Sequence, residues 1–235
     1  MDIDKEFEAI DALLEKPVCY IAGGHSLYLY QPSMGTIYLV SEILEGVKGR
    51  WFDISKCNPA SVMMFVDNNP RLSRRVVAVM SMEDRKSAMK EDALKAVLDV
   101  LEKVDNDDVC KLLLIASKWF SRAKELSRYY EIDRESEYRA RVSRIKQEGE
   151  NGSLFFGGKS VWGSTIDAVC KKYGWTLDYV MWGISSINLN MIMLDGIESV
   201  YLSKEERKKA HIPNDRNVIN ADDPENFKRI KDLFK

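Results

Sequence analysis

The spacing of apolar residues at the start of the chain predicts an amphipathic helix. Ile3, Phe7, Ile10 and Leu14 follow one another at intervals of four, three and four residues, which places them on one helical face. Pro17 ends this helix, because proline has no backbone N–H to donate and its ring restricts the preceding residue to extended conformations.

A β-hairpin is predicted directly after this helix. Residues 18–21 and 26–30 are two short runs of mostly apolar and aromatic side chains, and Gly23 and Gly24 lie between them. Glycine accepts the positive φ of a tight turn without steric cost, so we expect the two runs to pair across this turn.

A succession of helices is predicted from residue 33 to residue 120. Most of them begin after a side chain that can accept a backbone N–H, and proline at the first helical position sacrifices no hydrogen bond. These candidate caps are Ser33 or Thr36, Asn58, Asn69 and Asp105. The apolar residues behind the caps recur with helical spacing, so we predict a mainly α-helical fold with a short N-terminal β-hairpin.

Residues 121–150 predict a long, partly exposed helix or a helical hairpin. Charges of both signs dominate this stretch, and its apolar residues are sparse but spaced for a helix. A change of composition at residues 150–153 marks the best candidate linker. We therefore expect a first domain over residues 1–150, built from the hairpin, the helices and the long charged helix.

Residues 151–202 predict a small, aromatic-rich helical module. One helix ends at Gly174 after a basic last turn, Thr176 can cap the next, and residues 185–194 form a third apolar stretch. Residues 203–235 predict a polar C-terminal tail, extended apart from a last helical turn near its end.

The charge balance excludes several classes of protein. The 235 residues include 35 Lys and Arg and 37 Asp and Glu, so the formal net charge is 35 − 37 = −2. Hydrophobic residues make up 45% of the chain, which argues against global disorder. The lack of a basic excess argues against nucleic acid as a partner. No apolar run approaches the roughly twenty residues of a membrane span, so we expect a cytoplasmic protein without a membrane partner.

No metal, redox or cofactor site is predicted. The four cysteines are far apart and form no CxxC pair, which predicts buried free thiols rather than a zinc site or a disulfide scaffold. They are Cys19, Cys57, Cys110 and Cys170. His25 and His211 lack partners at the spacing of metal ligands, and no GxSxG motif provides a nucleophile. We expect no catalytic residue and no enzymatic activity.

Gly157-Gly158-Lys159-Ser160 is similar to the end of a phosphate-binding Walker A loop. The full motif requires glycine at position 153, where this chain has Ser153. A charged helix and a linker precede the loop instead of a buried strand. We therefore favour a simple Gly-Gly turn, and a nucleotide-binding enzyme that uses residues 157–160 remains the third and least favoured function.

Two basic clusters are candidates for contacts with phosphate. Arg71, Arg74 and Arg75 form the first cluster, and residues 207–209 form the second. Acidic residues lie near both clusters and the overall charge is nearly neutral, so we expect solvated helix faces rather than a polyanion site.

An aromatic cluster gives the strongest indication of a binding surface. Tyr173, Trp175, Tyr179 and Trp182 lie within ten residues. Core packing explains such a cluster, but two Trp and two Tyr in a short segment are also typical of a hot spot for partner binding. Both interpretations stay open, and these four residues are the candidate partner-binding site.

Two stretches of the chain together resemble a known family. Residues 21–36 read IAGGHSLYLYQPSMGT, a short hairpin followed by Pro-Ser-x-Gly before an apolar helix. Residues 166–182 read IDAVCKKYGWTLDYVMW, in which a Tyr-Gly-Trp turn precedes a helix. Both are similar to segments of the tail assembly chaperones of long-tailed bacteriophages, and together with the apolar helices that follow them they cover about a quarter of the chain.

This resemblance implies a role without enzymatic chemistry. Such chaperones keep the tape-measure protein soluble and bring tail-tube subunits to it in the host bacterial cytoplasm. The implied partners are therefore the tape-measure protein, the tail-tube protein or further copies of this chain. A structural component of a virion or phage-like particle is the alternative function. Residues 58–150 do not align with the family pattern, so the resemblance leaves the binding surface unassigned.

Overall fold

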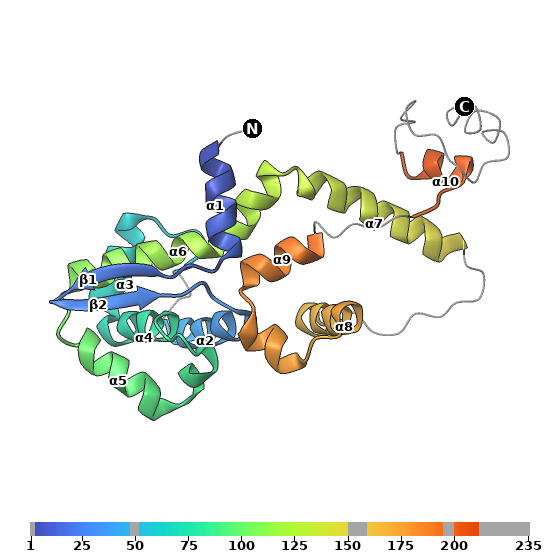
Figure 1. The fold of residues 1–235 in the computed structure, drawn as a ribbon. Helices are drawn as coiled ribbons and strands as arrows, with labels where there is room; N and C mark the ends of the chain where they lie inside the picture. Colours follow the sequence, from blue (N-terminus) through green and yellow to red (C-terminus); the bar gives the residue numbers. More distant parts are fainter. Residues whose placement is uncertain (1–2, 48–51, 150–158, 195–199, 212–235) are drawn as a thin grey trace, which may run out of the picture. The chain divides into compact units, whose positions relative to one another are not determined.

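The chain divides into two compact units (Figure 1). The computed structural model describes residues 3–47, 52–149, 159–194 and 200–211. Unit 1 comprises residues 1–133 and 156–196, and unit 2 comprises residues 134–155 and 197–235. The boundaries of these units differ from those of the predicted domains 1–150, 151–202 and 203–235. Most of the predicted aromatic-rich module belongs to the same unit as the N-terminal part of the chain.

Unit 1 begins with a helix and a hairpin, as predicted. The helix α1 (Ile3–Leu13) is followed by the antiparallel strands β1 (Val18–Ala22) and β2 (His25–Leu29). Gly23 and Gly24 form the turn with φ of 55° and 78°, a conformation that costs glycine nothing.

Helices make up most of the rest of unit 1. They are α2 (Met34–Glu45), α3 (Pro59–Asn68), α4 (Pro70–Met80), the 3-10 turn η2 (Arg85–Met89), α5 (Glu91–Leu101) and α6 (Asn106–Tyr129). Their apolar faces and the inner face of the hairpin form one core, in which the rings of Phe52 and Phe65 stack at 4.1 Å. The predicted fold class, mainly α with an N-terminal hairpin, is confirmed.

Three of the four predicted helix caps are confirmed. Ser33 accepts the N–H of Thr36 at 3.2 Å, Asn58 takes part in a capping box, and Asp105 caps α6. Asn69 behaves differently, because its side-chain amide donates to the carbonyl of Phe65 at 3.3 Å. This side chain therefore ends α3 and makes no capping hydrogen bond to α4.

The C-terminal part of unit 1 follows the predicted order of elements. It contains α8 (Val161–Tyr173), the π-helical turn η3 (Tyr179–Gly183) and α9 (Ser186–Leu194). Gly174 ends α8 with φ of 67°, and the hydroxyl of Thr176 accepts the N–H of Tyr179 at 3.2 Å. Both features match the stop and the cap predicted from sequence.

Two segments about 150 residues apart in sequence meet at the start of α2. The backbone N–H of Ser186 donates to the carbonyl of Pro32 at 2.8 Å, and Ser33 and Ser185 form an isolated β-bridge. The ring of Trp182 lies so close to Gly35 that a Cβ there would be 2.4 Å from a ring carbon. The absence of a side chain at residue 35 therefore permits this contact.

A hydrogen-bonded cluster joins the hairpin to the first turn of α6. Tyr20 and Lys111 both donate to Oδ1 of Asp108, each at 2.8 Å. These two bonds, led by the one from Lys111, lower the pKa of the Asp108 carboxyl. The bond to Asp108 in turn raises the pKa of the Tyr20 hydroxyl. The folded state thus favours a charged Asp108 and a neutral Tyr20.

Unit 2 contains most of the helix α7 (Ile132–Gly149), because the unit begins at residue 134. It also contains the short helix α10 (Lys204–Lys209). Lys146 on α7 pairs with Glu206 on α10 at 3.0 Å, and Ser203 and Glu206 form a capping box. The tail was predicted to be extended at this point, and that prediction is wrong. The capping box and the opposite charges at the two ends of α10 explain why these few residues are helical.

The charged stretch 121–150 is divided between two helices. It supplies the end of α6 and all of α7 up to Gly149, with a break at Tyr130 and Glu131. Glu131 has φ of 55°, which is outside the right-handed helical region and interrupts the helix.

We predict that Gly35→Ala destabilises unit 1 by about 1–3 kcal/mol, because the new methyl group overlaps the Trp182 ring. Gly163→Ala in α8 is the matched control, since its Cβ would meet Ser160 at 3.5 Å, an ordinary contact. Alanine is the better helix former, so the control gains up to about 1 kcal/mol. Urea unfolding followed by circular dichroism measures the free energy of unfolding of both variants. Equal changes in the two variants would contradict the close packing of Trp182 on Gly35.

We predict that Asp108→Asn makes the stability less dependent on pH on the acid side. The lowered pKa means that Asp108 stabilises the fold above the carboxyl's ordinary pKa and that this contribution is lost as pH falls through the folded-state value. The variant lacks the contribution already at pH 7. Urea midpoints at about pH 7 and about pH 3 test this, with the exposed Asp99→Asn as the control. An unchanged pH dependence in Asp108→Asn would refute the role of the cluster.

Candidate functional site

The apolar face of α1 points away from the body of unit 1. Phe7, Ile10 and Leu14, which the sequence places on one face, are 63%, 47% and 61% exposed. The helix packs instead through Ala9 and Ala12, which are buried. Small side chains let the α1 backbone approach its neighbours closely, and the larger side chains are left for the outer surface.

The buried side of α1 contacts α6 and α9. Ala9 and Ala12 share a small apolar cluster with Leu126 of α6 and Ile187 of α9. With 3.6 residues per turn, Leu13 lies between the buried alanines and the outward face. Leu13 is therefore the edge at which the two surfaces of α1 meet.

An apolar cavity of about 490 Å³ opens beside this edge. Its walls come from α1, α6, α8 and α9 and consist mostly of aliphatic and aromatic side chains. They include Ala9, Leu13, Leu126, Tyr130, Tyr173 and Met191. We call this cavity, together with the outward face of α1, the α1 groove.

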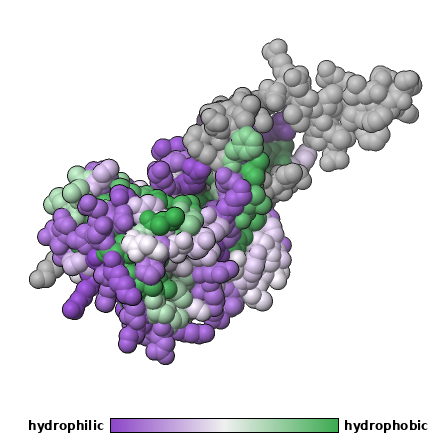
Figure 2. Space-filling model, turned by 60° about the vertical axis from the view of Figure 1, so that its left-hand side comes forward, coloured by the Kyte–Doolittle hydropathy of each residue, from purple (hydrophilic) through white to green (hydrophobic). Residues whose placement is uncertain are grey.

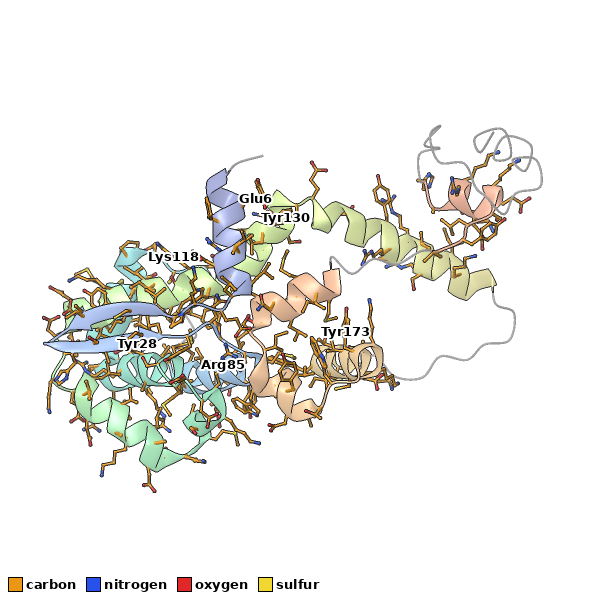
Figure 3. All side chains as sticks on the ribbon, in the orientation of Figure 1. Glu6, Tyr28, Arg85, Lys118, Tyr130 and Tyr173 are labelled. Carbon is orange, nitrogen blue, oxygen red and sulfur yellow. The ribbon has the colours of Figure 1, made fainter. Side chains whose placement is uncertain are left out.

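Two tyrosines line the α1 groove and present both apolar rings and polar hydroxyls. Tyr130 donates its hydroxyl to Glu6 of α1 at 3.1 Å, and Tyr173 donates to the carbonyl of Ile192 at 3.2 Å (Figure 3). These hydrogen bonds fix the rings in place. A rigid ring with a polar end suits a surface that binds another protein.

A buried polar network supports the wall of the groove. Oε1 of Glu15 accepts the backbone N–H of Ser185 at 2.8 Å and the side-chain amide of Asn188 at 2.9 Å. The Asn188 amide also donates to the carbonyl of Leu13 at 3.0 Å. Arg85 completes the network by donating to Oε2 of Glu15. The network therefore joins the end of α1 to the start of α9.

Glu15 adopts an unusual backbone conformation to take part in this network. Its φ of 51° is in the left-handed region, which residues other than glycine rarely occupy. The side chains of Arg85 and Glu15 are only 11% and 22% exposed. The ion pair and the hydrogen bonds to α9 offset the cost of this conformation.

The structure brings three of the four predicted aromatic residues together. The rings of Tyr173 and Trp175 stack at 5.0 Å, and Trp175 meets Tyr179 edge to face at 5.1 Å. Trp182 lies elsewhere, half-buried on Gly35. Tyr173 borders the α1 groove, and Tyr179 is 44% exposed. The role of the four aromatic residues in partner binding stays a prediction.

The phosphate-loop candidate is only partly described. Gly157 and Gly158 lie outside the described residues, and Lys159 is exposed. The hydroxyl of Ser160 accepts the N–H of Gly163 at 3.2 Å and so caps α8. Ser160 therefore has a structural role in the described part of this loop.

Two of the three arginines of the first basic cluster make contacts within the protein, and the third, Arg71, is exposed. Arg74 donates to the carbonyls of Leu101 and Val104 at 3.0 and 2.8 Å, at the end of α5. Arg75 forms two hydrogen bonds with the carboxylate of Glu91. These two guanidinium groups therefore already have partners.

The cysteines only partly match their prediction. Cys110 is buried, and burial raises the pKa of its thiol. Cys19 is exposed on the outer face of the hairpin, so the prediction of four buried thiols is wrong. Within the described ranges, no group of three or more Cys, His, Asp and Glu side chains could hold a metal ion.

Sequence reasoning missed the α1 groove. The apolar stripe of α1 was visible, but a stripe of this kind normally faces the core. The only signal of the opposite orientation is the pair of alanines, Ala9 and Ala12, on another face of the same helix. Exposed apolar surface is also visible among hydrophilic surface in the space-filling view (Figure 2).

Comparison with known proteins gives no match: no family model, no curated protein and no solved structure is similar to the chain. Among the helices that the structure describes, none combines the length and the apolarity needed to cross a membrane.

We predict that Glu15→Ala destabilises unit 1 by about 3–5 kcal/mol, because it leaves the buried guanidinium of Arg85 without its carboxylate. Lys171→Ala is the control, since its ion pair with Asp167 is solvent-exposed and contributes less than about 1 kcal/mol. Chemical unfolding measures both variants. Similar losses in the two variants would show that the network does not hold α1 to α9.

Proposed function

We propose that the chain is a non-enzymatic binding protein that holds an amphipathic helix of another protein in the α1 groove. The outward face of α1 is the observation that supports this function. Phe7, Ile10 and Leu14 are exposed, and Leu13, which is also exposed, lines an apolar cavity of about 490 Å³. Contiguous exposed apolar surface is typical of protein interaction sites.

The shape of the groove favours a helix as the bound element. The outward residues of α1 recur at i, i+3 and i+7, the spacing with which two helices pack side by side. The cavity next to Leu13 can receive a large apolar side chain of the partner. Tyr130 and Tyr173 add rigid aromatic contacts at the border. This is the helix-in-groove mode of recognition.

For the partner we propose the tape-measure or tail-tube protein of a long-tailed bacteriophage, bound during tail assembly in the host cytoplasm. The resemblance of residues 21–36 and 166–182 to tail assembly chaperones supports this choice. It is consistent with this choice that the two stretches pack against each other in unit 1, through Gly35 and Trp182. Long tape-measure helices expose apolar faces, which a mostly helical chaperone can cover.

We predict that Phe7→Asp and Leu14→Asp each weaken partner binding at least about tenfold, because a charge would be placed in an apolar contact. Both positions are exposed, so the fold should stay intact. Met63→Asp on α3 is the control, because Met63 is also exposed, at 54%, but lies on another helix. The chain and its variants are co-expressed with the tape-measure and tail-tube proteins of the same phage genome, and co-purification is quantified.

Two outcomes would contradict the proposed function. Equal losses of binding for Met63→Asp and Phe7→Asp would remove the α1 groove as the binding surface. Mass spectrometry of purified particles gives the second test, since a chaperone should be absent from the finished particle. Stoichiometric amounts in the particle would favour a structural component instead.

A further inference from the structure

A second cavity, of about 480 Å³, lies between the end of α1, the start of β1 and α6. Its wall combines apolar and cationic side chains, which are Val18, Ile115, Trp119, Lys16, Lys118 and Arg122. The cavity is of the size typical for small-molecule or peptide-end binding. We call it the cationic cavity.

The charge of the cationic cavity is opposite to that of the whole chain. Among the described residues, three cations and one acid, Asp11, line it, a formal sum of 3 − 1 = +2, whereas the chain carries −2. Lys16 pairs with Asp11 at 2.6 Å. Lys118 has no carboxylate within ion-pair distance among the described residues, and it is exposed on α6 (Figure 3). The cavity therefore attracts an anionic group.

Gln31 supplies a buried acceptor at the same cavity. The residue is only 3% exposed and lines the wall. Its Nε2 donates to the carbonyl of Asp11 at 3.4 Å, which orients the amide, and its Oε1 has no hydrogen-bond partner among the residues that the structure describes. A buried amide oxygen without a donor is unfavourable, so a bound N–H would stabilise this site.

We propose that the cationic cavity binds the C-terminal end of a peptide whose last side chain is apolar. The terminal carboxylate pairs with Lys118, the last peptide N–H donates to Oε1 of Gln31, and the apolar side chain packs on Trp119. Capture of a C-terminal carboxylate is a recurring mode of peptide recognition. A free phosphate ion offers neither an apolar group nor a peptide N–H, so it would leave two of these three features unused.

The cationic cavity and the cavity of the α1 groove share Ala12, and their other described lining residues differ. Asp11 and Leu13 are two residues apart, so their side chains lie about 160° apart around α1 if successive residues are about 100° apart. One borders the cationic cavity and the other borders the groove. The two sites can therefore be tested separately with single variants.

The first test compares two peptides on the full-length chain. A fluorescein-labelled peptide, Gly-Ser-Gly-Leu-Phe, is prepared with a free C-terminal carboxylate and with a C-terminal amide, and binding is followed by fluorescence anisotropy. We expect the carboxylate peptide to bind at least about tenfold more tightly, as charge-assisted hydrogen bonds predict. Equal binding of the two peptides, or no binding of either, would overturn the proposal.

Variants then locate the site on the chain. We expect Lys118→Gln to weaken binding of the carboxylate peptide about tenfold. Lys124→Gln makes the same change at an exposed position of α6 outside the cavity and should leave the affinity unchanged. Gln31→Met should also weaken binding, with its fold checked by circular dichroism. Equal losses for Lys118→Gln and Lys124→Gln would refute the site.

Two further measurements separate this proposal from its alternatives. Displacement of the peptide by an equal concentration of inorganic phosphate would show a site for small anions only and would overturn the proposal. Phe7→Asp should leave peptide binding intact, because Phe7 does not line the cationic cavity. Loss of peptide binding in Phe7→Asp would instead place the peptide in the α1 groove.

Discussion

The close approach of Trp182 to Gly35 is the contact on which the arrangement of unit 1 depends. Because residue 35 has no side chain, the indole ring can lie directly on α2. The chain after this ring then reaches Pro32, where Ser186 donates to its carbonyl. Residues far apart in sequence are thereby joined, and α9 is positioned to meet α1.

The polar network around Glu15 depends on that placement. Ser185 and Asn188 can donate to Glu15 only because α9 begins next to the end of α1. Arg85 balances the carboxylate, which would otherwise be costly in so closed an environment. The network holds the buried side of α1 in place, and the outward side remains available for another protein.

The location of charge in the tertiary structure matters more than its sum. Arg74 and Arg75 use their guanidinium groups within unit 1, and so they do not present a basic surface. Lys118 lies at a cavity whose local charge is opposite to the net charge of the chain. The near-neutral net charge of the chain therefore predicts neither the internal contacts of Arg74 and Arg75 nor the local charge of the cationic cavity.

The sequence by itself determined the local elements. Capping side chains, prolines and the Gly-Gly turn act on neighbouring backbone, so the helices, the hairpin and the stop at Gly174 were predictable. Only the tertiary structure decided which face of α1 is buried and which helix Asn69 caps. It also decided that Trp182 packs on Gly35 and not with the other three aromatic residues. These outcomes depend on how well surfaces from distant parts of the chain pack together. The spacing of apolar residues shows which side chains share a helix face, but it does not show which face will be buried.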